Sequence, residues 1–106
     1  MTLQITYNDL MLLERDIYEQ MKSPAFKIFN QDKIKRFFQL NSMRLNAMHE
    51  TMNALIKKHV LHDEKDKPVT FEENGAMRYK FKNNDDETIY KEEAEKFLSR
   101  TIKLDL

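Results

Sequence analysis

The chain has 106 residues, no cysteine, a single glycine and a formal net charge of zero. This length fits one domain over residues 1–106, and the missing cysteine excludes disulfides, thiolate catalysis and cysteine-based zinc sites. Hydrophobic residues make up 41% and charged residues 34% of the sequence. These proportions are too apolar for a disordered chain and too charged for a membrane protein.

The charge is divided unevenly along the chain. Residues 1–60 hold nine Lys/Arg and six Asp/Glu, a net charge of +3, and residues 61–106 hold nine and twelve, a net charge of −3. Opposite charges can favour head-to-tail contact between two copies. Charges scattered to keep the surface soluble are the simpler interpretation.

The first thirty residues predict a strand, a helix and a short connector. Leu3 and Ile5 alternate with polar residues, which indicates a strand. Asn8 is a suitable N-cap for a helix of about 14 residues, and Pro24 ends that helix because proline disfavours helical geometry in the residue before it. Residues 25–29 are expected to form a buried connector or one helical turn, with Asn30 capping the next helix.

The dominant predicted element is one long helix over about residues 31–61. At 1.5 Å per residue it would be roughly 46 Å long. Its apolar positions follow an average period of 3.5, which is typical of a coiled-coil seam. The seam consists of Ile34, Phe38, Asn41, Leu45, Met48, Met52, Leu55 and His59.

This seam is longer than the first helix, which would cover only about half of it. The remainder is expected to contact the C-terminal elements or another protomer. The sequence therefore assigns Ile34, Phe38, Asn41, Leu45, Met48, Met52 and Leu55 to partner binding or self-association. Asn41 would fix the register of an oligomeric seam, or face water at the edge of a helical hairpin. The methionines either fill the core or adapt to a partner.

The second half of the chain predicts a β-hairpin over about residues 69–82 and a helix over about 86–100. A two-residue Asn74-Gly75 turn would put the apolar side chains on opposite faces of the hairpin. A three-residue turn would put them on one face, and we favour it. Ile102, Leu104 and Leu106 predict a last strand that pairs with Leu3 and Ile5.

These elements define the expected fold class, which is α+β and mainly α. We expect a helical hairpin with one long helix, a β-hairpin, a C-terminal helix, and short strands at both ends.

The best metal candidate is the pair His59 and His62, which are followed at once by two acids. Zinc usually requires three or four ligands, and histidines in a last helical turn are also explained by the helix dipole. The carboxylate pairs Glu72/Glu73, Asp85/Asp86 and Glu92/Glu93 fall in turns or on solvent faces, where their pKa values would not be separated for acid–base catalysis. We therefore expect no metal, no cofactor and no enzymatic activity.

Lys33, Lys35, Arg36 and Arg44 lie near Phe37 and Phe38, which is a possible nucleic-acid stripe. Nucleic-acid helices usually carry denser basic runs, and both phenylalanines fall on or beside the seam. A protein partner or a homo-oligomer is the expected interaction, with neither nucleic acid nor membrane.

The run Leu55–His59, followed by His62-Asp63-Glu64-Lys65-Asp66-Lys67-Pro68-Val69, resembles a pattern in small, uncharacterised tailed-bacteriophage proteins. In that family a Tyr-Gly pair follows the long helix, where this chain has His59-Val60-Leu61-His62. The resemblance implies a phage-encoded structural or virion-associated protein, found in the host cytoplasm or the virion. The alternative is a phage regulator that binds and inhibits a host protein, or a small nucleic-acid-binding protein.

Overall fold

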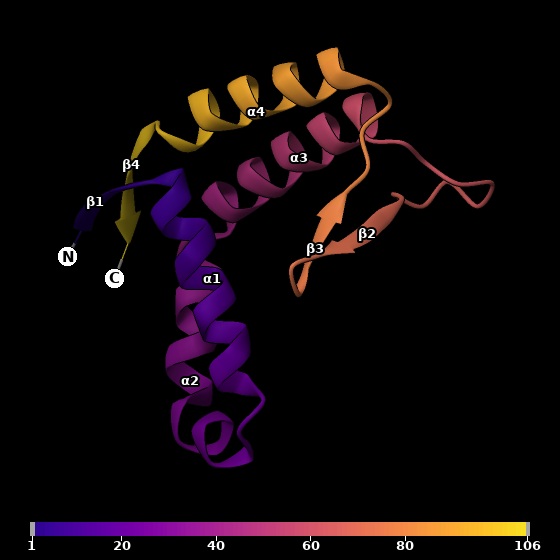
Figure 1. The fold of residues 1–106 in the computed structure, drawn as a ribbon. Helices are drawn as coiled ribbons and strands as arrows, with labels where there is room; N and C mark the ends of the chain where they lie inside the picture. Colours follow the sequence, from indigo (N-terminus) through magenta and orange to yellow (C-terminus); the bar gives the residue numbers. More distant parts are fainter. Residues whose placement is uncertain (1, 106) are drawn as a thin grey trace. The chain divides into compact units, whose positions relative to one another are not determined.

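The structure is a computed structural model that describes residues 2–105, apart from the side chains of Lys27 and Phe29. Most of these residues are helical, and the strands form two antiparallel pairs, β1 with β4 and β2 with β3 (Figure 1). The predicted α+β, mainly α class with strands at both ends is confirmed. The elements are β1 (Thr2–Thr6), α1 (Tyr7–Met21), α2 (Pro24–Leu40), α3 (Ser42–His59), β2 (Thr70–Glu73), β3 (Ala76–Tyr79), α4 (Asn84–Leu98) and β4 (Thr101–Asp105).

Internal contacts divide the chain into two compact units. The first comprises Met1–His49 and Leu98–Leu106, and the second comprises Glu50–Phe97. We describe each unit by itself. That the whole chain behaves as a single domain stays a prediction.

The two ends of the chain pair in the first unit, as predicted. Leu3 lies opposite Leu104, and Ile5 lies opposite Ile102. Ile102 and Leu104 are buried, with 6% and 1% of their surface exposed, so β4 places alternate side chains in the core.

Helix α1 begins at Tyr7, two residues earlier than the Asn8 cap predicts. Thr6 is the N-cap: its side chain accepts from the Asp9 backbone N–H, and the Asp9 carboxylate accepts from the Thr6 N–H, both at 3.2 Å. This reciprocal pair satisfies two backbone donors that a helix start leaves unpaired. Helix α1 ends before Ser23, as Pro24 predicts.

The prediction of a connector before Asn30 is wrong, because α2 already begins at Pro24. Proline suits a first helical turn, since its missing N–H would have no intrahelical partner there. Asn30 lies inside α2, where its side-chain amide donates to the Phe26 carbonyl at 3.0 Å. Helices α1 and α2 form the helical hairpin of the first unit (Figure 1).

The single long helix over 31–61 is also wrong, because the helix is interrupted at Asn41. This residue has φ −113° and ψ 16°, outside helical geometry. Its side-chain amide donates to the Phe37 carbonyl at 3.0 Å and to the Asp105 carbonyl at 2.8 Å, and its side-chain oxygen accepts from the Asp105 N–H at 2.8 Å. The Asn41 side chain therefore bonds to the Asp105 backbone as the peptide group of a neighbouring strand would. The helix bends at this residue.

The hairpin has the register that we did not favour. Glu73 pairs with Ala76 and Phe71 with Arg78, which leaves Asn74 and Gly75 as a two-residue turn. Both turn residues have positive φ, 52° and 80°, as a type I′ turn requires. Every residue of β2 and β3 is exposed, so no core face forces the apolar side chains together, and the turn sets the register.

Backbone hydrogen bonds fasten the base of the hairpin to the end of α3. The Leu61 N–H donates to the Lys80 carbonyl at 2.8 Å, and the Val69 N–H donates to the Leu61 carbonyl at 2.8 Å. Val60 also forms an isolated β-bridge with Phe81. The base of the hairpin is therefore held within the second unit, while its tip projects.

Asn83 caps helix α4. The Asn83 side-chain oxygen accepts from the Asp86 N–H at 2.8 Å. The first turn of α4 also carries Asp85, Asp86 and Glu87, whose negative charge is favourable at a helix N-terminus.

We predict that Asn41→Ala lowers the free energy of unfolding by about 2–3 kcal/mol, since it leaves the backbone N–H and carbonyl of Asp105 without the amide that pairs with them. Urea unfolding measures this change. Asn46→Ala is the matched control, because Asn46 is exposed on α3. Equal unfolding midpoints for the two variants would contradict the structural role of Asn41.

We predict that Gly75→Ala destabilises the hairpin by about 1 kcal/mol, because an L side chain is strained at positive φ. No atom lies within 4 Å of the added Cβ, so collision plays no part. Hydrogen exchange of the hairpin amides should speed up roughly fivefold, with the amides of α1 unchanged. Glu72→Ala is the control, and unchanged exchange in Gly75→Ala would show that the turn has a different geometry.

Candidate functional site

The seam residues that the sequence assigns to a partner are largely covered within the chain itself. Leu45 is 5% exposed and Met48 is 2% exposed. Phe38 is partly buried and lies against Tyr18 of α1, with ring centroids 5.7 Å apart. The expectation that the seam is open to a partner is therefore wrong for its buried members, which are Ile34, Asn41, Leu45, Met48 and Leu55.

Asn41 takes neither of the two roles that the sequence suggests. It is 1% exposed, so it does not face water, and its amide is fully occupied by backbone groups of the same chain. A buried amide that is satisfied in this way stabilises a particular chain geometry.

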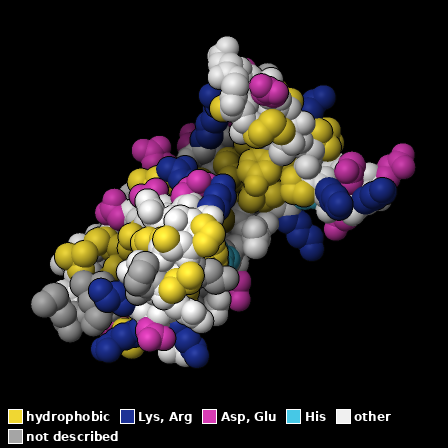
Figure 2. Space-filling view, turned by 90° about the horizontal axis from the view of Figure 1, so that it is seen from below, with side chains coloured by type: hydrophobic (Ala, Val, Ile, Leu, Met, Phe, Trp, Pro, Cys, Tyr) yellow, Lys and Arg dark blue, Asp and Glu magenta, His cyan; other side chains and the backbone are white. Residues whose placement is uncertain are grey.

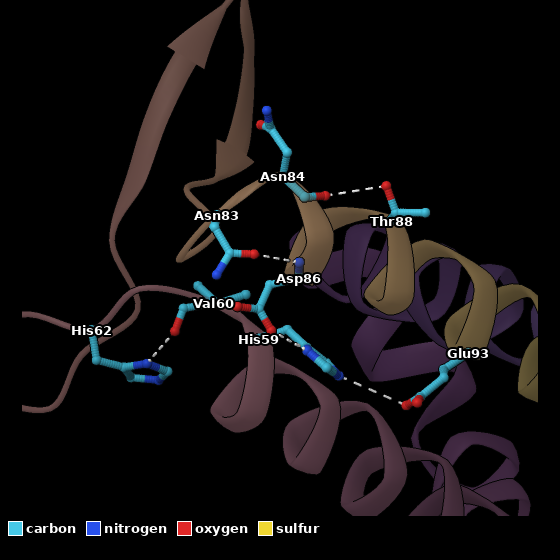
Figure 3. A network of polar contacts seen from close by, with 8 residues as sticks. All are labelled: His59, Val60, His62, Asn83, Asn84, Asp86, Thr88 and Glu93. Atoms are coloured by element: carbon cyan, nitrogen blue, oxygen red, sulfur yellow. Dashed lines mark hydrogen bonds and ion pairs between the residues drawn. The ribbon is translucent and has the colours of Figure 1, made fainter.

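His59, at the end of α3, is the centre of a buried polar cluster in the second unit (Figure 3). Its side chain is 3% exposed, and its Nδ1 lies 2.7 Å from Asp86 Oδ1. Its Nε2 has no hydrogen-bond partner, and the Glu93 carboxylate is 3.8 Å away. Both acids come from α4, so the cluster joins α4 to the end of α3.

His62 does not join this cluster, which corrects the metal candidate. Its Nδ1 lies 2.7 Å from the Val60 carbonyl, and Figure 3 shows its ring separate from that of His59. Among residues 2–105, with the two undescribed side chains set aside, no group of three or more His, Cys, Asp or Glu residues is placed to hold a metal ion.

Sequence reasoning missed Asp86 and Glu93 because it treated both as members of exposed carboxylate pairs. They lie seven residues apart, two turns of α4, and face the same way as the buried Ala94 and Phe97. That periodicity is the signal that could have found them. Their role depends on His59, which lies 27 residues before Asp86.

The hairpin and α4 enclose a hollow of about 400 Å³ in the second unit. Aromatic and aliphatic side chains line it together with charges of both signs. Among these, Lys91 is paired with Glu87 at 2.9 Å. The lining residues are Phe71, Glu73, Met77, Arg78, Tyr79, Phe81, Glu87 and Lys91.

Tyr90 of α4 contacts Phe81, which lines this hollow, with ring centroids 5.1 Å apart. Burial raises the pKa of the Tyr90 hydroxyl above its ordinary value of 10.0, and the nearby Tyr79 hydroxyl raises it further. Ionisation of the Tyr90 hydroxyl is therefore less favourable in the folded chain than in water.

Comparison of the chain with protein-family models, curated proteins and solved structures gave no match. Across the described part of the chain, every helix is too short or too polar to cross a membrane.

We predict that wild-type stability falls above pH 10 more steeply than that of Tyr90→Phe. The raised pKa means that the folded state holds the Tyr90 proton more tightly than the unfolded state, so this contribution is complete below pH 10.0 and is lost as the pH rises through the folded-state pKa. Urea unfolding over a pH series measures the difference.

Tyr18→Phe is the control for this experiment, because Tyr18 is 53% exposed. Parallel pH curves for the wild type and Tyr90→Phe would show that the Tyr90 hydroxyl is not buried as described.

Proposed function

We propose that the protein is a non-catalytic protein–protein interaction module that binds its partner through the hairpin. One observation carries this proposal: β2 and β3 are exposed at every residue and yet carry large apolar side chains. Phe71 is 42% exposed, Met77 67% and Tyr79 37%. We call these three residues the hairpin surface.

A two-stranded sheet that buries neither face is marginally stable by itself in water. Its outer backbone groups are unpaired, which makes it a template for an added strand or a covering segment. Burying an exposed apolar side chain contributes roughly 1.5–3 kcal/mol. A partner that covers the hairpin surface would thus gain affinity and stabilise the hairpin at the same time.

Figure 2 shows hydrophobic side chains at the surface in groups, interrupted by charged ones.

The surroundings of His59 support a structural role rather than catalysis. A carboxylate such as Asp86 orients histidine in many enzymes, but the histidine must then exchange a proton with a substrate or nucleophile. Here Nε2 is buried without a hydrogen-bond partner, and the Glu93 carboxylate lies 3.8 Å away. The cluster is explained by its position between α3 and α4.

We further propose, from the phage-like run over residues 55–69, that the module is a structural or virion-associated component of a tailed phage. It would act in the host cytoplasm, in the virion, or in both. An exposed hairpin fixed at its base suits assembly, because it can be covered when the chain joins a larger particle.

Site-specific photo-crosslinking tests the hairpin surface. With Met77→p-benzoylphenylalanine in producing cells, we expect a covalent adduct to one protein. Ile28→p-benzoylphenylalanine is the matched control, since Ile28 is 72% exposed on α2 and should give no such adduct. Met77→Asp should weaken binding to the captured protein at least tenfold, because it places a charge in an apolar contact.

The identity of the captured protein decides the setting. A virion protein, together with the chain itself in purified particles, supports the assembly role. A host protein, with the chain missing from particles, supports the regulator instead. Equal capture at positions 28 and 77 would contradict binding through the hairpin.

A further inference from the structure

The first unit carries a second exposed surface, at the bend between α2 and α3. Two hollows of about 460 Å³ and 190 Å³ meet there and share Leu40 and Asp105 in their linings. Leu40 is 43% exposed and Met43 is 85% exposed. We call this surface the basic groove: its floor is Phe37, Leu40 and Met43, and its rim is Lys33, Arg36 and Arg44.

Most of the charged side chains that line the groove are positive. Its rim contributes three cations, and Asp105 is the only acid among its lining residues. Within residues 2–105 as described, no ion pair joins Lys33, Arg36 or Arg44 to an acid. Unpaired cations around an apolar floor fit a segment that presents carboxylates around an apolar side chain.

Helix α4 presents this complementary pattern. It contains six acids against two lysines, a net charge of −4. Asp86 and Glu93 face His59, whereas Asp85 and Glu92 lie about 100° further round the helix and are exposed. Ile89 lies between these two acids on that face and is 41% exposed, because residues spaced four and three apart share a helix face.

We propose that the basic groove binds the outer face of α4 from a second copy of this chain. Ile89 would lie on the floor formed by Leu40 and Met43, with Asp85 and Glu92 beside the rim cations. This inference goes beyond the hairpin proposal, since it uses a different surface and a different partner.

The floor of the groove favours a protein segment over nucleic acid. Bases stack on aromatic rings, and phosphates need cations alone. Of the three floor residues only Phe37 is aromatic, while Leu40 and Met43 are aliphatic. An isoleucine side chain fills such a floor and removes exposed apolar surface from water on both sides of the contact.

The contact joins two different surfaces, so in a pair one copy keeps a free helix and the other keeps a free groove. Such a head-to-tail contact repeats from copy to copy and produces chains, or rings if the rotation closes. Surface ion pairs are screened by salt, so association should weaken as ionic strength rises.

Sedimentation velocity of the full chain at low ionic strength, over a range of concentrations, tests this contact. We expect the wild type to form species larger than a dimer. Arg36→Glu disables the groove and Glu92→Arg disables the helix, so each variant alone should remain monomeric. Both residues are exposed, and circular dichroism checks that both variants fold.

Sedimentation of a mixture of the two variants is the decisive experiment. The intact helix of Arg36→Glu can dock in the intact groove of Glu92→Arg, so the mixture should associate although neither variant does so alone. Glu64→Arg and Met77→Asp are controls that should associate like the wild type, which keeps this contact separate from the hairpin. If Arg36→Glu does not fold, Met43→Lys replaces it.

Four results would overturn the proposal. They are a wild type that is monomeric at every concentration, oligomers that Arg36→Glu leaves unchanged, a mixture that stays monomeric, or binding of a single-stranded DNA oligonucleotide that Arg36→Glu abolishes while self-association is absent. The last result would assign the groove to nucleic acid.

Discussion

The hydrogen bonds between the Asn41 side chain and the Asp105 backbone hold the first unit together. At one residue they join the bend between α2 and α3 to the last strand of the chain. Because β4 also pairs with β1, and β1 leads directly into α1, the same pair connects both chain ends with the helical hairpin. A side-chain amide can do this because it carries both a donor and an acceptor, as a strand's peptide group does.

The bend at Asn41 also determines which surfaces remain for binding. A straight helix over residues 31–61 would have displayed one continuous apolar seam. The bent chain buries Leu45 and Met48 instead, and it turns Leu40 and Met43 outward. The two surfaces for which we propose partners, the basic groove at the bend and the hairpin in the second unit, are both apolar with charges around them.

The second unit relies on a comparable polar anchor. His59 is buried at the end of α3 and is held by Asp86 of α4, and the backbone just beyond it supports the base of the hairpin. A buried histidine with one unpaired nitrogen costs free energy, which hydrogen bonding to the carboxylate partly offsets. These contacts fix the base of the hairpin, although every residue of its two strands is exposed.

Local chemistry in the sequence was sufficient for much of the fold. Alternation at both ends predicted the pairing of Leu3 with Leu104, because a short strand with one apolar face needs a matching strand. Pro24 predicted the end of α1, since proline restricts the residue before it. The hairpin was located correctly, but its register was wrong, because we assumed a buried face where the turn geometry of Asn74 and Gly75 decided the pairing.

The sequence by itself determined the α+β class, the terminal strands, the end of α1, and the approximate locations of the hairpin and of α4, because these depend on residues close together in the chain. Only the tertiary structure decided the break at Asn41 and the burial of His59. Their partners, Asp105 and Asp86, lie 64 and 27 residues away. No periodicity within a helix encodes a hydrogen bond to so distant a segment, so which apolar residues become core and which become surface was settled only by folding.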